Sequence, residues 1–272
     1  MGAWLRDKLT ERVEVTRLLR EERFVYADGS PVRDRAPYTP HTFVWFHRDL
    51  PDETPVPGQI EIVHRDDRLV VIDKPAFLSS IPRGQHIRES VVVRLRDNLL
   101  LPELTPLHRL DRITSGLLVC ATQQRWRGPY QSLFQNGGMT KTCRALAPIH
   151  DDLELPITVA NHISKPRGAP SAQVLPGALI NAETHVALES HLDDFGVYRL
   201  TPRTGRTHQL RMHLNGLGIP IVGDPLYPVD LELAVDDFSQ PLQLLAAEIS
   251  FTDPINGTQR RFMSTRRLPL SR

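Results

Sequence analysis

The chain of 272 residues is poor in cysteine, in lysine and in long apolar segments, and the first and last of these shortages each exclude a class of protein or site. Cys120 and Cys143 are its two cysteines and they do not form a closely spaced pair, so neither a disulfide framework nor a structural zinc site is expected. The sequence has no run of about 18 apolar residues, so we expect no membrane span. The first residues lack the apolar core of a signal peptide, and we therefore expect a cytoplasmic protein with reduced thiols.

The charge composition permits an RNA partner without requiring one. The formal net charge is only +1, which alone argues against a strongly basic nucleic-acid-binding protein. However, 29 of the 33 basic residues are arginine, which makes planar, bidentate contacts with phosphates and stacks on bases. A GC-rich coding sequence would also raise the arginine content, so both explanations stay open.

A proline-rich acidic segment divides the sequence into two parts. Residues 50–58 contain three prolines and two acids, a composition that is typical of a linker. We therefore predict a small N-terminal module of residues 1–57 and a larger module of residues 58–272. Apolar spacing in the small module predicts one or two short helices, followed by strands at 24–26 and 42–46.

The larger module has the pattern of an α+β domain with a mixed, mostly antiparallel sheet and flanking helices. Strands are predicted at 60–64, 69–72, 117–121, 140–147, 159–164, 185–192 and 197–201, with a short strand and turn at 220–227 and a last strand at 242–251. Helices are predicted at 89–101 and 126–134, the second beginning near Gly128 and Pro129. A third helix is predicted to begin with Thr207 as its N-cap.

Asp111 is the acid around which the larger module is organised. It lies between Arg109 and Arg112 in a segment, residues 106–119, that is otherwise rich in leucine and ends in an apolar strand. A charged group beside apolar surface is costly unless it is paired. Residues 206–211 offer cations far downstream, and we predict that the two segments meet in the folded protein.

Other candidate sites have weaker support. His208 and His213 are five residues apart, whereas a helical metal-binding pair prefers the i, i+4 spacing, so no metal site is expected. A hydrolase that uses Asp111 and His208 has no supporting spacing. The sequence also lacks a glycine-rich phosphate loop. The basic loop of residues 165–170 is typical of a solvated connection, although such loops can also contact phosphates.

Three ordered blocks of sequence resemble one known family of RNA-modifying enzymes. They are residues 66–75, His108–Asp111 with residues 114–117, and residues 205–214 followed by Gly223 and Asp224. Together they resemble the RluA family of pseudouridine synthases over roughly residues 58–272. The resemblance implies the pseudouridine synthase fold with a central active-site cleft. It also implies isomerisation of a uridine in rRNA or tRNA, without a cofactor or a metal ion, and we expect a monomer.

The resemblance also assigns roles to individual residues. Asp111 aligns with the catalytic nucleophile, and Arg211 aligns with the basic residue that pairs with it. Arg109 aligns with an arginine that moves into the RNA when the target base is flipped out. We expect three further residues to contact RNA: Arg206, His108 and Lys74. Many family members carry a small RNA-binding S4 domain at the N-terminus, and residues 1–57 resemble a degenerate S4-like module.

Cys143 departs from the family pattern. The family has Lys-x-Tyr on the strand after the second block, and its tyrosine packs on the target base, whereas here Cys143 follows Lys141 and Thr142. A thiol cannot stack on uracil, and by itself Cys143 is typical of a small buried hydrophobic residue that supports the site. Another tyrosine could fill the role, the enzyme could work slowly or differently, or the chain could be a catalytically silent RNA-binding homologue. The candidate tyrosines are Tyr130, Tyr198 and Tyr227.

Overall fold

The contacts of the computed structural model divide the chain into two compact units, Met1–Asp52 and Glu53–Arg272. The structure describes residues 1–272 except 10–12, 48, 51, 85 and 271–272. The division falls within the predicted linker of residues 50–58, slightly before the predicted end of the first module. Within the described residues, no helix combines the length and the apolar character that a membrane crossing requires.

The N-terminal unit is built from two short helices and a two-stranded antiparallel sheet. The helices are α1 (Gly2–Lys8) and α2 (Val15–Arg20), and the strands are β1 (Phe24–Tyr26) and β2 (Val44–Phe46). Leu5, Leu18 and Phe24 are buried in its small core, where the ring of Phe24 stacks on that of Phe46 at 5.2 Å. The predicted helices and strands of this part are therefore confirmed.

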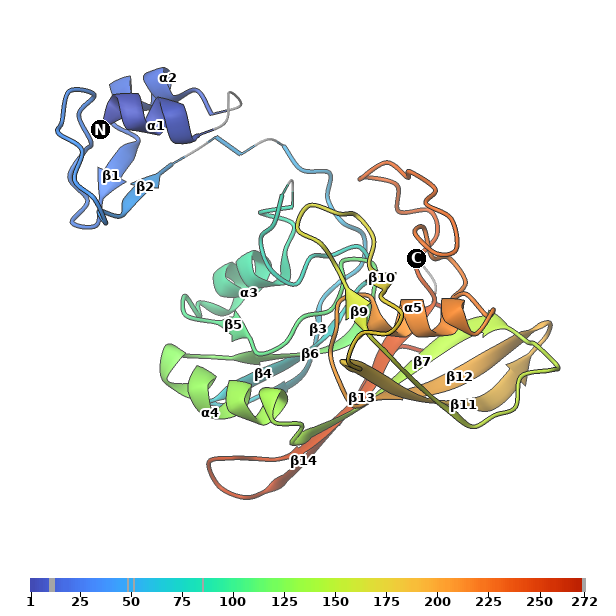
Figure 1. Cartoon of the computed structure of the whole chain (residues 1–272). Coiled ribbons are helices and arrows are strands. Elements are labelled where there is room, and N and C mark those ends of the chain that lie inside the picture. The colour runs from blue at the N-terminus through green and yellow to red at the C-terminus, as the bar shows by residue number, and fades with distance from the viewer. Residues whose placement is uncertain (10–12, 48, 51, 85, 271–272) are drawn as a thin grey trace. The chain divides into compact units, whose positions relative to one another are not determined.

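The larger unit is organised on a sheet of ten strands (Figure 1). These are β3 (Glu61–Arg65), β4 (Leu69–Lys74), β5 (Thr105–Pro106), β6 (Ser115–Ala121), β7 (Met139–Pro148), β8 (Ile157–Asn161), β11 (Ala182–Leu192), β12 (Phe195–Pro202), β13 (Leu244–Thr252) and β14 (Gln259–Met263). The main path of the sheet runs β3-β4-β6-β13-β7-β12-β11-β8, with β5 on β6 and β14 on β13. The β6–β13 pair is parallel and the other recorded pairs are antiparallel, as predicted.

The sheet consists of two halves that meet at the β6–β13 pair. We call β3, β4, β5 and β6 the first half and the remaining strands the second half. The halves are joined by the pairs Leu245–Ser115 and Ala246–Gly116. Gly116 has a φ of +108°, and a Cβ atom there would lie 2.4 Å from the carbonyl oxygen of Ala246. The junction therefore requires glycine for both its backbone conformation and its close approach.

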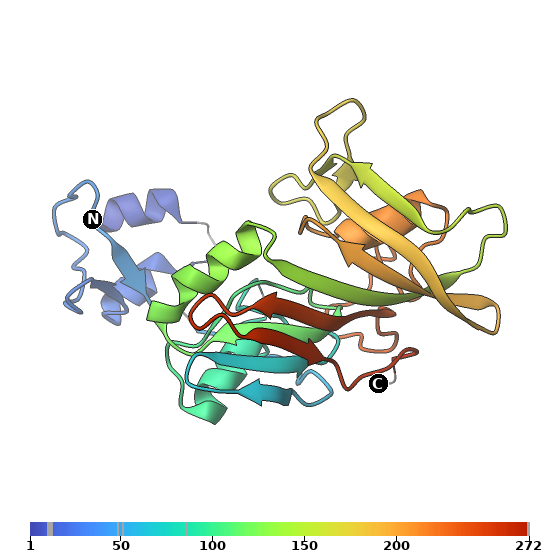
Figure 2. The ribbon, with the colours of Figure 1, turned by 90° about the horizontal axis from the view of Figure 1, so that it is seen from below.

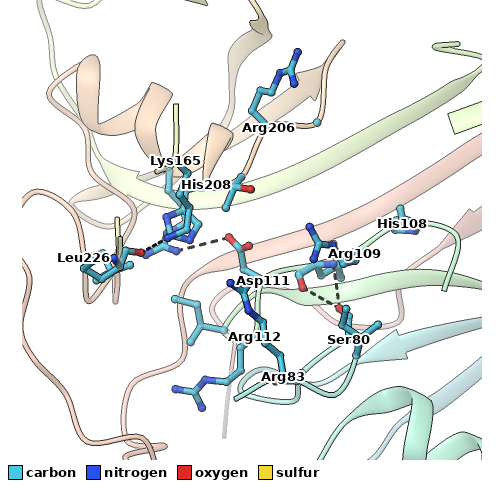
Figure 3. A pocket seen from close by; sticks show the side chains of 18 of the residues that line it. Ser80, Arg83, His108, Arg109, Asp111, Arg112, Lys165, Arg206, His208 and Leu226 are labelled. Carbon is cyan, nitrogen blue, oxygen red and sulfur yellow. Dashed lines mark hydrogen bonds and ion pairs between the residues drawn. The ribbon is translucent and has the colours of Figure 1, made fainter. Parts of the chain in front are cut away.

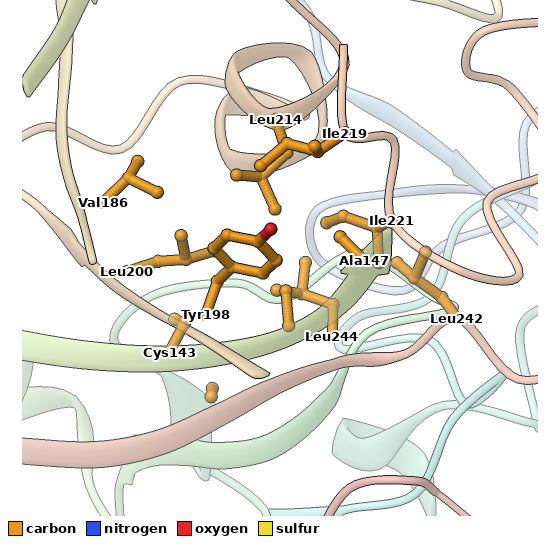
Figure 4. Close-up of a cluster of buried hydrophobic side chains, with 12 residues drawn as sticks. Cys143, Ala147, Val186, Tyr198, Leu200, Leu214, Ile219, Ile221, Leu242 and Leu244 are labelled. Carbon is orange, nitrogen blue, oxygen red and sulfur yellow. The ribbon is translucent and has the colours of Figure 1, made fainter. Parts of the chain in front are cut away.

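Three helices cover these halves (Figure 2): α3 (Val91–Leu99) and α4 (Gln124–Gln135) lie against the first, and α5 (Gln209–Gly216) lies against the second. Strand β4 is buried on both faces, because Leu69 and Val71 pack in the cluster that includes Tyr130 of α4, whereas Val70 and Ile72 pack in the cluster that includes α3. The unbroken apolar run at 69–72 indicated such a strand correctly. A third cluster fills the space between α5 and strands of the second half (Figure 4).

Two of the predicted helix starts are wrong. Helix α4 begins at Gln124, so Pro129 lies inside it, and the packing of the fully buried Tyr130 overrides the local preference of proline for a first turn. Helix α5 has His208 rather than Thr207 as its N-cap. The side chain of Gln209 holds the preceding turn instead, because its Oε1 accepts hydrogen bonds from the Arg206 N–H at 2.9 Å and from the Thr204 hydroxyl at 2.8 Å.

Three strand predictions also need correction. The strand predicted at 159–164 is split into β8 and β9 (Ile163–Ser164), and β9 pairs with β10 (Gln173–Val174) in a separate hairpin. The segment 220–227 forms turns, although the Val222 N–H donates to the Leu146 carbonyl at 2.9 Å. Strand β13 was predicted as the last strand, but β14 follows it. Phe262 is the one buried residue of β14, and the three residues before it are polar or charged, so this strand has little apolar pattern.

Candidate active site

A cavity of about 1280 Å³ lies beside the loop that carries Asp111 (Figure 3). Among the described residues that line it, nine are arginine or lysine and four are aspartate or glutamate. The basic loop of residues 165–170 forms part of the wall, which the sequence left open as either a connection or a phosphate contact. A near-neutral chain therefore concentrates positive charge at one cavity, which is suited to an anionic polymer.

The Asp111 loop is fixed by its backbone. The hydroxyl of the buried Ser80 donates to the carbonyl of Leu110 at 2.8 Å and accepts from the N–H of the same residue at 3.1 Å. The N–H of Thr114 donates to the carbonyl of Asp111 at 3.1 Å and closes the turn before β6. The Asp111 side chain remains 31% exposed, so the loop presents a carboxylate to the cavity from a defined position.

Lys74 acts inside the protein, and its predicted contact with RNA is wrong. Its side chain is fully buried, and its Nζ donates to the carbonyls of Pro75, Leu78 and Arg112 at 2.8–3.0 Å. Burial lowers the pKa of Lys74 to about 7, although the charge of Asp111 acts in the opposite direction. With all three donors used, Lys74 ties the segment after β4 to the Asp111 loop. The sequence showed a charge at a strand end but could not show its burial.

His108 likewise has a clear structural contact. Its Nε2 accepts the N–H of Val119 in β6 at 3.1 Å, and its ring stacks on Phe134 with 4.8 Å between the ring centroids. Burial lowers the pKa of His108 well below its usual value, so the ring is neutral and suited to accepting this bond. His108 also lines the cavity, and its predicted contact with RNA stays a prediction.

Arg211 meets Asp111 as predicted, but it has a closer partner. Its Nη1 lies 3.7 Å from Asp111 Oδ2, whereas its Nε and Nη2 donate to the two carboxylate oxygens of Asp224 at 2.7 and 2.5 Å. Burial acts to lower the pKa of Arg211, but the hydrogen-bonded Asp224 outweighs it and raises the pKa. Asp224 was part of the third sequence block, which was the available signal, yet its role was not assigned.

Tyr227 lies behind Arg211 and His208. The Arg211 Cζ lies 5.1 Å from the centroid of the Tyr227 ring. The Tyr227 hydroxyl lies 2.9 Å from His208 Nδ1 and accepts the N–H of Ala172 at 2.7 Å. Burial lowers the pKa of His208 to about 4, with Asp111 acting in the opposite direction. Tyr227 therefore orients two cavity residues and does not itself offer a face for a base to stack on.

None of the three candidate tyrosines takes the place of the missing family tyrosine. Tyr130 binds the carboxylate of Asp253 with its hydroxyl, and the Tyr198 hydroxyl donates to the Pro148 carbonyl at 2.8 Å in the core shown in Figure 4. Cys143 lines a smaller cavity of about 140 Å³ together with Asp111. Burial raises the pKa of the Cys143 thiol to about 11, so the thiol stays protonated. The alternative in which Tyr130, Tyr198 or Tyr227 fills the role of the family tyrosine is therefore wrong.

Arg109 and Arg206 both project from exposed positions at the cavity. Arg206 Nε donates to the Asn181 carbonyl at 3.0 Å. Within the described residues, the Arg109 guanidinium makes no hydrogen bond or ion pair, so it can contact RNA without breaking an internal bond. Among the residues that the structure describes, no group of three or more His, Cys, Asp or Glu side chains could hold a metal ion.

Comparisons with known proteins agree with this geometry. A family model described as RNA pseudouridylate synthase matches residues 68–216. The dual-specificity RNA pseudouridine synthase RluA of Vibrio vulnificus is 33% identical over 207 residues, which are 71% of this chain and 78% of that protein. The tRNA pseudouridine synthase C of Vibrio cholerae is 33% identical over 215 residues, which are 72% of this chain and 86% of that protein.

Solved structures show the same fold. Human RNA pseudouridylate synthase domain containing 1 superposes with a TM-score of 0.63 at 24% identity, covering 78% of this chain and 86% of that one. Human RNA pseudouridylate synthase domain containing 4 gives a TM-score of 0.56 at 27% identity, covering 75% and 87%. The predicted pseudouridine synthase fold is thus confirmed, and the chain belongs to the RNA pseudouridylate synthase family, to its RluA group.

Proposed function

We propose that this protein converts uridine to pseudouridine in RNA and that Asp111 is its nucleophile. The observation that carries the proposal is the Asp111 carboxylate, which faces a basic cavity and lies 3.7 Å from a guanidinium that is itself buried. Arg211 compensates the charge of the acid, and Asp224 holds Arg211 in place. The family membership and the names of the relatives support the same reaction.

The reaction needs no co-reactant. The bond between N1 of uracil and C1′ of ribose breaks, a bond between C5 and C1′ forms, a proton leaves C5, and a proton reaches N1. Substrate and product therefore contain the same atoms at the same oxidation level. Asp111 attacks the nucleotide while the base is detached and turned, and the bond that it forms breaks again when C5 is joined to C1′, so that the carboxylate is regenerated. The cavity holds the detached base close to the sugar.

RNA, either rRNA or tRNA, is the proposed partner, and the positive cavity lining supports it. A base inside a helix cannot reach Asp111, so the nucleotide must be flipped out, which costs a few kcal/mol. Arg109 is well placed to enter the vacated stack, where a guanidinium can stack on the neighbouring bases. Arg206 at the same cavity is proposed to contact the backbone of the RNA.

The sequence supports three further proposals. The protein is a cytoplasmic monomer, and its N-terminal unit is a degenerate S4-like RNA-binding module.

Cys143 is compatible with catalysis in this proposal. The acid, its arginine partner and Arg109 are all at the cavity, and the relatives are named as synthases. We therefore retain the enzyme over the catalytically silent homologue. The two hypotheses differ in whether a site that lacks the family tyrosine still catalyses the reaction.

The test is the release of tritium from C5-tritiated uridine in RNA taken from a strain that lacks the gene. Wild-type protein is expected to release tritium and Asp111→Asn, which keeps the shape of the side chain, is expected to release none. Cys143→Tyr is measured beside them. A silent wild-type protein together with an active Cys143→Tyr variant would establish the RNA-binding homologue instead.

A further inference from the structure

His208 is placed at the cavity by an unusual backbone conformation. It is the N-cap of α5 and has a φ of +58°, in the left-handed region that non-glycine residues rarely adopt. Its half-buried side chain lines both the large cavity and the smaller one that Asp111 and Cys143 share. Figure 3 shows His208 next to Lys165, on one side of Asp111. Such strain at a functional site indicates that the position of this ring matters.

A chain of hydrogen bonds favours one position for the proton of the His208 ring. The Ala172 N–H donates to the Tyr227 hydroxyl oxygen at 2.7 Å, which leaves the hydroxyl proton available to a second partner. His208 Nδ1 lies at 2.9 Å, closer than the alternative acceptor, the Ala172 carbonyl at 3.4 Å. The shorter distance favours donation from the Tyr227 hydroxyl to Nδ1 over donation to the Ala172 carbonyl. In a neutral imidazole whose Nδ1 accepts, the proton is on Nε2.

The Nε2–H of His208 is unused inside the protein. Within the described residues, Nε2 makes no hydrogen bond, whereas Nδ1 is tied to the buried Tyr227. Because burial lowers the pKa of His208 to about 4, the ring is neutral near pH 7 even beside the Asp111 carboxylate. The result is a fixed, uncharged donor at the cavity.

We propose that His208 is a catalytic residue whose Nε2–H donates a hydrogen bond to a carbonyl oxygen of the uracil while the base is detached from the ribose. This inference rests on the proposed function. When the N1–C1′ bond breaks, its electron pair stays with the ring, and the negative charge spreads onto the carbonyl oxygens. A donor that is already oriented toward the place where such charge develops stabilises it without reorganisation.

His208 keeps its proton throughout this step. The detached ring forms its new bond to C1′ through C5, C5 then loses its proton, and N1 gains one. The donor therefore lowers the energy of the detached base without being consumed. It also gives the small cavity a polar contact with uracil at a place where Cys143 offers only a weakly polar thiol. Tyr227 is a positioning residue in this arrangement, because it acts through His208.

The test compares two matched substitutions, His208→Gln and His208→Met. Both side chains are unbranched, similar in length and subject to the same backbone strain, but only glutamine retains an N–H donor near the position of Nε2. Removing one such donor costs roughly 100-fold or more in kcat, so His208→Met should lose about that factor in the tritium-release assay. His208→Gln should be much faster than His208→Met, and both should bind RNA with the wild-type Kd.

Equal rates in the two variants would overturn the inference, as would a loss in His208→Met that appears in Kd and not in kcat. Thermal unfolding of each variant shows whether it is folded at the assay temperature. A second measurement uses wild-type protein alone: ¹⁵N NMR of the histidine rings should show the Nε2–H tautomer for His208, and the Nδ1–H tautomer would refute it. If Asp111→Asn is inactive and His208→Met is fully active, the proposed function stands and only this inference fails.

Discussion

Removing the charge of Asp224 should lower both the free energy of unfolding and the catalytic rate. The Asp224 side chain is 1% exposed, and its oxygens accept the Nε and Nη2 of Arg211 and the backbone N–H groups of Leu226 and Tyr227. Asp224→Asn keeps the shape but leaves a guanidinium that is 2% exposed with Asp111, at 3.7 Å, as its remaining carboxylate. Breaking a buried ion pair by removing one partner costs about 3–5 kcal/mol.

Urea unfolding followed by circular dichroism measures this loss in free energy of unfolding. The matched control is Arg261→Ala, which removes a pair with Glu248 whose arginine side chain is 65% exposed. Water screens an exposed pair and its contribution to stability is small, so the control should change the free energy of unfolding little. A loss in Asp224→Asn as small as that of the control would refute the argument that Asp224 neutralises a buried cation.

The same variant tests the geometry of the acid. Without Asp224, the Arg211 guanidinium is expected to move toward Asp111 and to displace the carboxylate from its position for attack. A displacement of about 1 Å can reduce a rate roughly 100-fold. Tritium release by Asp224→Asn, measured below its unfolding transition, should fall accordingly, and an unchanged rate would contradict this coupling.

Three further outcomes are expected. Burial lowers the pKa of His213 to about 4, so the unfolded state binds its proton first and stability falls as the pH drops from about 6.5 to 4, by less than about 1.4 kcal/mol per pH unit. His213→Gln should flatten that pH profile of urea unfolding, and His191→Gln, at an exposed position, should not. Arg206→Ala should weaken RNA binding and reduce the slope of log K against log salt by about 1, and an unchanged slope would exclude the proposed contact with the RNA backbone. Tyr227→Phe leaves the buried N–H of Ala172 without its acceptor and should cost about 1–3 kcal/mol in unfolding; no measurable change would show that the bond is unimportant.

Much of the fold could be predicted because its signal is local. The apolar run at 69–72 has no polar position, as a strand buried on both faces requires, and the structure places its side chains in two different clusters. Strand β14 could not be predicted, because its single buried phenylalanine does not produce the alternation of apolar and polar residues that marks a strand. The start of α4 was missed because Tyr130 and its contact with Asp253, more than a hundred residues away, decide where the helix lies.

The candidate site was predicted in part. The apolar neighbours of Asp111 indicated that it needs a cation, and Arg211 lies 3.7 Å from it. The sequence could not show that Arg211 lies closer to Asp224, at 2.5 Å. Lys74 was assigned to RNA because it lies at a strand end, where binding residues are often found. Its three carbonyl acceptors come from two loops, a convergence that depends on the folded chain.

The glycine at the junction of the two half-sheets sets the geometry of the reaction centre. Asp111 belongs to the loop that enters β6, whereas Arg211 belongs to α5 on the second half, so the gap between acid and cation depends on how these halves meet. Gly116 makes that meeting possible, since its backbone approaches Ala246 more closely than any side chain would allow. The distance between Asp111 and Arg211 is therefore sensitive to a residue that does not itself line the cavity.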